Sequence, residues 1–335
     1  MDRIAPPSPR TAPVYSVVIP VYRTEAFIAD LLGDFAAISE AARQRFGVAM
    51  EFVFVVDASP DRSYERLQEV LPQAPFASQL LLHGRNFGSF AAIRTGLQAG
   101  RGDYFAAIAA DRQEPAELLL QFLSVLLDGE HDVVVGTRIS RQDPALSKAM
   151  SSLFWRMYRR LIIRDMPQGG VDVFACTSWF RGELLKLREA HSSLVGLIFW
   201  LGCRRAEIGY ERRERRHGRS AWTLGKKITY LLDSVFSFSD LPIRVLSGLG
   251  MVGIACSLVL GCVVIAMKIL GDIPVPGYAA TLITIVFFGG VNALGLGVVG
   301  AYAWRTYENT KQRMLAVVHR LHSFAGTLPH ETDAP

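Results

Sequence analysis

The chain has 335 residues, half of them hydrophobic, and a formal net charge of +5. This length is sufficient for one or two domains with a complete hydrophobic core. The basic excess is modest and lies beside long apolar segments, which favours lipid headgroups or a phosphate ligand and excludes nucleic acid as the expected partner. The four cysteines include no Cys-x-x-Cys pair, so we expect neither a disulfide nor a zinc site.

The first 140 residues alternate apolar strand patterns with helical patterns. Residues 1–13 lack the apolar run of a signal peptide and are predicted to be a disordered lead. Strands are expected at 15–21, 51–56, 80–82, 104–110 and 131–138, and helices at 26–45, 64–70, 91–99 and 116–127. Strands that alternate with helices predict an α/β fold with a doubly wound, mostly parallel sheet.

Polar residues follow three of these strands, at the edge where parallel sheets bind ligands. Asp111 and Gln113 come directly after the strand at 104–110. Asp111 either takes part in chemistry or caps the helix that starts near Pro115. Neither G-x-G-x-x-G nor a P-loop is present, which argues against a Rossmann oxidoreductase or a P-loop NTPase. Carboxylates at strand ends favour base and ribose contacts, with a divalent ion bridging a diphosphate.

Two apolar runs, 245–267 and 278–304, contain no Asp, Glu, Lys or Arg. Each reaches the roughly 20 residues that a transmembrane helix needs. Basic residues flank the pair on both outer sides, so the positive-inside rule predicts that both ends face the cytoplasm. The expected organisation is a lead (1–13), a cytoplasmic domain (14–222), an interfacial amphipathic helix (223–243), a two-helix transmembrane hairpin (244–304) and a cytoplasmic tail (305–335).

Five segments in a fixed order carry a resemblance to a known family. They are VVIPVY, VVDASPDRS, RNFGSFAAIRTGL, AADRQEP and VVVGTR. This series resembles the family 2 glycosyltransferases, in the branch of dolichol-phosphate mannose synthases and bacterial polyprenyl-phosphate glycosyltransferases. The resemblance extends through the paired apolar runs, and it implies a GT-A-like nucleotide-sugar domain.

The resemblance implies roles for residues at the strand ends. Pro20, Tyr22 and Asp57 would contact the base and ribose of a nucleotide sugar. Asp111 and Gln113 would bind a divalent cation, Mg²⁺ or Mn²⁺, on its diphosphate.

The sequence departs from the family pattern in three places. Ala109 stands where the commoner motif has its first Asp, Glu114 stands where Asp is usual, and Arg23-Thr24 replace Asn-Glu. Loss of one carboxylate makes metal binding weaker or more dependent on the diphosphate. Farther along, Asp172 in QGGVDVF either binds sugar hydroxyls or pins its loop.

A phosphate-bearing acceptor is expected to meet the second half of the domain. Residues 143–160 form an amphipathic basic pattern that is typical of a helix on a bilayer surface. Lys148 and Ser152 lie one helical turn apart and could reach the same phosphate. The resemblance implies that Arg138, Lys148 and Ser152 hold the acceptor phosphate.

The segment YERRERRHGRSAW, residues 210–222, is the most charged in the chain. It resembles the family's R-x-x-G-x-S-K segment, with Arg215 and Ser220 in place and Ala221 where Lys is common. Arg212 and Arg215 are our candidates for the diphosphate and acceptor-phosphate contacts, with Ser220 beside them.

Together these features predict an inverting glycosyltransferase in the inner (cytoplasmic) membrane, a multi-pass protein with its catalytic domain and both termini in the cytoplasm. It would move one sugar from a nucleotide diphosphate sugar, a UDP-sugar, to undecaprenyl or a similar polyprenyl phosphate. Asp111, Arg138 and Arg215 would carry the reaction. The alternatives are a non-catalytic membrane homologue that binds nucleotide sugar or lipid, and a processive polysaccharide synthase. A homo-oligomer is left open.

Overall fold

The computed structural model describes residues 12–140, 156, 159–160, 163, 165–167, 170–189, 192–213, 232–270 and 277–326. The chain divides into two compact units, which are described separately. The first contains residues up to Arg188, Ser193–Ala221 and everything from Met314 onward. The second contains Glu189–Ser192 and Trp222–Arg313.

The first unit is built on one eight-stranded sheet in the order β7-β5-β6-β4-β1-β2-β3-β8. The strands are β1 (Val14–Val21), β2 (Ala49–Val56), β3 (Ala77–His83), β4 (Tyr104–Ala107), β5 (Val133–Ser140), β6 (Val171–Thr177), β7 (Arg205–Glu211) and β8 (Val318–Phe324). Four neighbouring pairs are parallel, namely β1–β2, β1–β4, β2–β3 and β5–β7. The predicted α/β fold with a mostly parallel sheet is therefore confirmed, but β6 and β8 run antiparallel to their neighbours.

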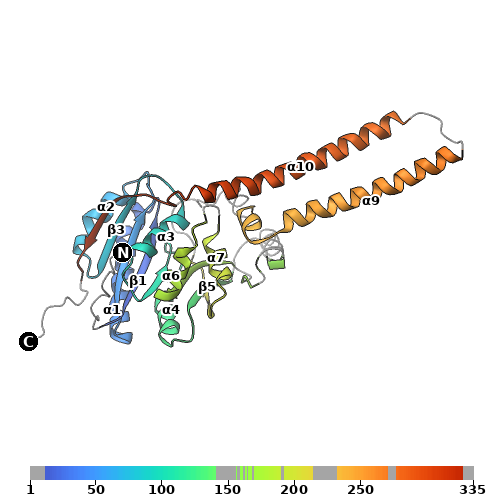
Figure 1. The fold of residues 1–335 in the computed structure, drawn as a ribbon. Helices are drawn as coiled ribbons and strands as arrows, with labels where there is room; N and C mark the ends of the chain where they lie inside the picture. The colour runs from blue at the N-terminus through green and yellow to red at the C-terminus, as the bar shows by residue number, and fades with distance from the viewer. Residues whose placement is uncertain are drawn as a thin grey trace, which may run out of the picture. The chain divides into compact units, whose positions relative to one another are not determined.

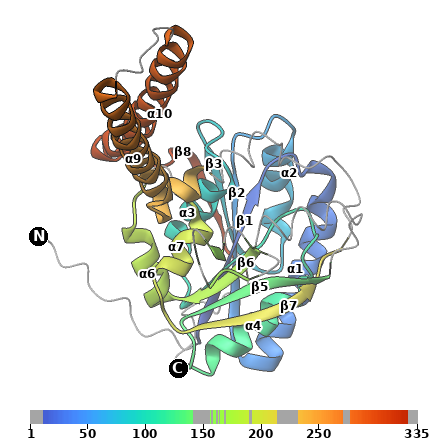
Figure 2. The same cartoon turned by 90° about the vertical axis from the view of Figure 1, so that its right-hand side faces the viewer.

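Helices cover both faces of this sheet (Figures 1 and 2). One face carries α1 (Ile28–Phe46), α2 (Ser63–Val70) and α4 (Leu118–Leu127), and the other carries α3 (Ser89–Ala99) and α6 (Ser178–Lys186). Two 3-10 turns, η1 (Glu25–Phe27) and η2 (Leu71–Gln73), and the short α7 (Leu194–Trp200) complete the described elements of this unit.

The core lies between the central strands and α1. Phe35 of α1 stacks on Phe52 of β2 with ring centroids 4.5 Å apart. On the other face α3 approaches β1 very closely at Gly96, where an added Cβ would lie 2.2 Å from Val18 Cγ1. The central strands are buried on both faces, as expected of parallel strands between helical layers. Their carboxyl ends therefore have a rigid support.

The sheet differs from the sequence prediction at four strands. Neither β6, which contains Asp172 of the segment expected as a loop, nor β7 was predicted as a strand. The strand predicted at 104–110 ends at Ala107, because its pairing with β6 stops there at Phe174. Asp111 therefore lies in a turn beyond the strand. The last difference is β8, which falls in the segment assigned to the tail and adds an edge strand beside β3.

The second unit contains two long helices, α9 (Leu241–Ile269) and α10 (Tyr278–Thr310). Within them, Leu241–Met267 and Phe287–Thr310 are long and apolar enough to cross a membrane, by length and composition. Only 7% of the first apolar window and none of the second is buried, unlike the core helix of a soluble protein. Residues 232–238, in the predicted interfacial helix, are also helical.

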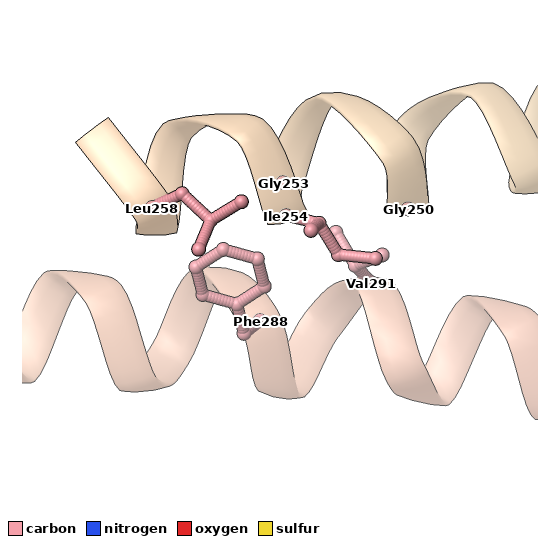
Figure 3. A pocket seen from close by; sticks show the side chains of 6 residues that line it. All are labelled: Gly250, Gly253, Ile254, Leu258, Phe288 and Val291. Carbon is pink, nitrogen blue, oxygen red and sulfur yellow. The ribbon is translucent and has the colours of Figure 1, made fainter. Parts of the chain in front are cut away.

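The two long helices pack through small residues. Phe288 of α10 lies against Gly253 of α9, where an added Cβ would lie 2.7 Å from the ring. Beside this contact is an apolar pocket of about 420 Å³ that also involves Ile254, Leu258 and Val291 (Figure 3). Arg305 of α10 pairs with Asp233 at 2.9 Å. At the Phe288 contact, Gly253 allows the close helix approach that is common in membrane helix pairs.

Candidate functional site

Backbone strain is concentrated at one edge of the sheet. Four described non-glycine residues have a positive φ: Arg23 (56°), Ala58 (45°), Arg112 (57°) and Gln312 (48°). The first three follow β1, β2 and β4, which are neighbours in the sheet. Such conformations cost about 1–3 kcal/mol each and cluster at functional sites. The carboxyl ends of these three strands are therefore the candidate site, as the sequence predicted.

The loops after β1 and β2 are joined by hydrogen bonds. The backbone N–H of Arg23 donates to Ser59 Oγ at 2.7 Å, and that of Glu25 donates to Asp61 Oδ2 at 3.1 Å. Partial burial raises the pKa of Asp61, but hydrogen bonds from Ser59 and Ser63 outweigh it and the pKa is lowered. Asp61 thus stays ionised and holds both loops together.

These joined loops support two of the predicted nucleotide contacts. Pro20 lies near the end of β1, and Tyr22 follows directly with 38% of its surface exposed. An exposed aromatic ring on a fixed loop presents a flat face on which a base can stack.

Asp57, the third predicted nucleotide contact, is buried and already has several partners. Its Oδ1 accepts from His83 Nδ1 at 2.8 Å and from the Phe87 N–H at 2.8 Å, and its Oδ2 accepts from the Gly88 N–H at 2.7 Å. Because the carboxylate only accepts, His83 donates from Nδ1, and its Nε2 forms a hydrogen bond of 3.0 Å with Thr95 Oγ1. Asp57 therefore organises the loop between β3 and α3.

The turn after β4 contains the predicted cation ligands. The N–H of Gln113 donates to Asp111 Oδ1 at 3.3 Å. The side-chain Oε1 of Gln113 accepts from Arg212 Nη2 at 2.6 Å, and the Arg213 N–H donates to the Gln113 carbonyl at 2.9 Å. The structure thus brings Arg212 to Asp111 and Gln113, although Arg212 lies 99 residues after Gln113 in the sequence.

Glu114 is the most perturbed carboxyl of this site. Burial, assisted by the nearby Asp111 and Asp172, raises its pKa to about 7, although Arg212 opposes the shift. Its Oε1 lies 3.6 Å from Arg212 Nε, and its Oε2 is buried without a hydrogen-bond partner. Sequence reasoning noted Glu114 only as a departure from the family pattern, because burial cannot be read from the motif.

Two other predicted residues form a pair. Arg138 of β5 makes an ion pair with Asp172 of β6, and Tyr210 of β7 donates its hydroxyl to Asp172 Oδ2 at 3.1 Å. Burial lowers the pKa of Arg138, but Asp172 outweighs this and the pKa is raised. Burial and Asp172 also raise the pKa of Tyr210, which remains a neutral donor. The sequence did not single out Tyr210, whose role depends on the β5–β7 pairing.

The possible metal ligands at this site suit a cation that is shared with a substrate. The described residues hold no group of three His, Cys, Asp or Glu side chains that could enclose a metal ion. Magnesium often uses only one or two carboxylates and completes its shell with phosphate oxygens. Asp111 fits that role, whereas Gln113 would first have to release Arg212 from its amide oxygen.

Several predicted site residues lie outside the described part of the chain. These are Lys148 and Ser152 of the predicted amphipathic helix and Arg215 and Ser220 of the basic segment. Arg212 and Arg213, which directly precede that undescribed part of the segment, are described and contact the turn after β4.

The chain is similar to several known proteins. Residues 16–188 match the family model described as glycosyl transferase family 2. An uncharacterised glycosyltransferase of Synechocystis is 31% identical over 91% of this chain and 95% of its own. An undecaprenyl-phosphate 4-deoxy-4-formamido-L-arabinose transferase of Pseudomonas aeruginosa is 30% identical, over 91% and 89%. A prophage bactoprenol glucosyl transferase homologue of Escherichia coli is 28% identical, over 91% and 98%.

Proposed function

The chain belongs to glycosyl transferase family 2, and from that premise we propose that it transfers one sugar from a UDP-sugar to a polyprenyl phosphate. The observation that carries the proposal is the meeting of Asp111, Gln113 and Arg212 beside the strained loops. Relatives named for undecaprenyl-phosphate and bactoprenol transfer match over 91% of the chain. That length requires the match to reach the two apolar helices as well as the sheet.

The donor would lie along the carboxyl edge of the central strands. Tyr22 and Pro20 would contact the base, while Asp57 fixes the adjoining loop from below. Asp111 would hold a divalent cation, Mg²⁺ or Mn²⁺, whose charge supports departure of the diphosphate. Arg212 would supply a second positive charge beside it, assisted by Arg215.

The acceptor requires little activation. A phosphate monoester is already anionic near neutral pH, so the protein must mainly position it for inverting displacement at the anomeric carbon. Arg138, Lys148 and Ser152 would align this phosphate, and Asp172 would either fix Arg138 or bind sugar hydroxyls. The ion pair between Arg138 and Asp172 supports the first of these roles.

The two long helices would insert in the inner membrane, with the sheet-containing unit and both termini on the cytoplasmic side. The rest of the protein buries almost none of their apolar segments. Apolar surfaces of this kind favour a hydrocarbon environment. Arg244 directly precedes the uncharged run 245–267 of α9, and Lys311 and Arg313 follow α10, which agrees with the positive-inside rule.

The test is transfer by detergent-purified full-length protein. Undecaprenyl phosphate would be incubated with a panel of radiolabelled UDP- and GDP-sugars, with and without EDTA. We expect one donor to give a lipid-linked product that EDTA suppresses. Asp111→Asn should lower the rate at least about tenfold, or some 1.4 kcal/mol of barrier, whereas Glu69→Gln on the exposed face of α2 should not.

Ala109 motivates one competing function, a non-catalytic membrane protein that binds nucleotide sugar. Such a protein would bind UDP with a divalent ion but form no lipid-linked product with any donor. That result would reject the transferase proposal.

A further inference from the structure

Arg112 occupies an unusual place between the two predicted cation ligands. Its φ of 57° lies in the left-handed region, which a long unbranched side chain rarely adopts. Glycine, asparagine and aspartate are the residues that accept this region readily. The conformation reverses the chain between Asp111 and Gln113, so the orientation of both side chains depends on it. A strained residue persists only when its surroundings hold it in place.

The side chain of Arg112 supplies such a hold. Its Nε donates to Asp34 Oδ2 at 2.8 Å and its Nη2 donates to Asp34 Oδ1 at 3.1 Å. It also makes an ion pair with Asp30. Asp30 and Asp34 are one turn apart on α1, so both carboxylates lie on the same side of that helix. The arrangement is the bidentate geometry in which arginine–carboxylate pairs are strongest.

The exposure of the Arg112–Asp34 contact separates it from an ordinary surface ion pair. The Arg112 side chain is 22% exposed and that of Asp34 is 31% exposed, whereas that of Asp30 is 61% exposed. Exposed single pairs contribute little to stability, with a median of about 0–1 kcal/mol. Here one guanidinium bridges two carboxylates of a helix that belongs to the central core. The turn is also held on its far side, where the Arg213 N–H donates to the Gln113 carbonyl at 2.9 Å.

We propose that Arg112 is a positioning residue, whose contact with Asp30 and Asp34 holds the strained turn so that Asp111 and Gln113 face the donor diphosphate. The donor-binding part of this inference rests on the proposed function. The guanidinium itself points to α1 and does not touch the substrate. The loss of Arg112 should therefore weaken donor binding and leave acceptor binding unchanged.

The experiment compares Arg112→Gln, Arg112→Asn, Arg112→Lys and Asp34→Asn in the full-length protein. Arg112→Asn retains a residue that tolerates the left-handed region but removes the guanidinium. Arg66→Gln is the matched control, because Arg66 makes an ion pair of 3.0 Å with Glu69 on the exposed face of α2. The readouts are the KM for each substrate, kcat, and hydrogen exchange of peptides that cover residues 108–114.

We expect Arg112→Gln and Arg112→Asn to raise the donor KM about tenfold, with acceptor KM within about twofold of wild type. Asp34→Asn should raise the donor KM less, and Arg112→Lys should partly retain wild-type donor KM. Combining Arg112→Gln with Asp34→Asn should have less effect than the sum of the two single changes, since the two groups contact each other. Hydrogen exchange of residues 108–114 should accelerate most in the variants whose donor KM rises most. Arg66→Gln should change none of these quantities.

Two results would overturn the inference. In the first, Arg112→Asn keeps wild-type donor KM, which would show that only the backbone conformation matters. In the second, Arg112→Gln lowers the melting temperature but raises both KM values equally or leaves exchange in 108–114 unchanged, which would show a general structural role. If the wild-type protein transfers no sugar, the proposed function fails, and hydrogen exchange still decides whether Arg112 holds the turn.

Discussion

The buried carboxyl of Glu114 gives a pH dependence of stability with a definite sign. Its pKa is raised from 4.5 to about 7 in the folded protein, whereas the unfolded chain ionises it near the ordinary value. Between these two pH values the folded state therefore binds more protons than the unfolded state. Stability contributed by this group falls as the pH rises through that window.

The magnitude follows from the size of the displacement. A pKa shift of this size changes the free energy of unfolding by roughly 3 kcal/mol between the acidic and alkaline limits. The Glu114 side chain is 1% exposed, so solvent screening does little to reduce the effect. Glu114→Gln removes the ionisation but keeps the shape of the side chain. The variant should gain stability relative to wild type as the pH rises from 5 to 8.

The assay is thermal unfolding of the detergent-solubilised chain at pH 5 and pH 8. For a domain of this size, roughly 3 kcal/mol corresponds to a relative gain of about 6–12 °C in melting temperature. Glu117→Gln is the control, because Glu117 lies on the same turn with 64% of its side chain exposed. Parallel pH profiles for wild type and Glu114→Gln would refute the assignment of a buried, near-neutral carboxyl.

Two further predictions test the support of the site. Asp57→Asn should lose about 2–3 kcal/mol of unfolding free energy, measured by chemical denaturation. The reason is that an amide cannot accept all the hydrogen bonds that the carboxylate takes from His83, Phe87 and Gly88. Gly96→Ala should destabilise the protein by about 1–3 kcal/mol, because the added methyl would lie 2.2 Å from Val18 Cγ1, whereas the same change at Gly33, which has open space, should not.

The sequence predicted the elements whose signal is local. The apolar runs of β1 and β2 and the polar residues after them pointed to the same edge of the sheet as the strained loops. The strand β8 escaped prediction because Val318–Phe324 is short, mixed in polarity and largely exposed. It forms by pairing with β3, which lies more than two hundred residues earlier.

Contacts between residues far apart in the chain could also not be predicted from the sequence. The motif identified Asp111 and Gln113, but the contact of Gln113 with Arg212 depends on where β7 ends in space. In the same way, nothing in the segment DRQEP indicates that Arg112 reaches Asp34, 78 residues away. The elements were predictable from their own residues, whereas these partnerships depend on the assembled sheet.

Charge balance connects these partnerships to the proposed reaction. Around the turn after β4, four arginines that the structure describes already contact a carboxylate or an amide oxygen: Arg112, Arg138, Arg212 and Arg213. The carboxyl groups there are more numerous: Asp30, Asp34, Asp111, Glu114, Glu117 and Asp172. A diphosphate and an acceptor phosphate would add further negative charge, so binding both requires additional cations. The divalent ion proposed at Asp111 and the further arginines that follow Arg213 in the sequence would meet this requirement.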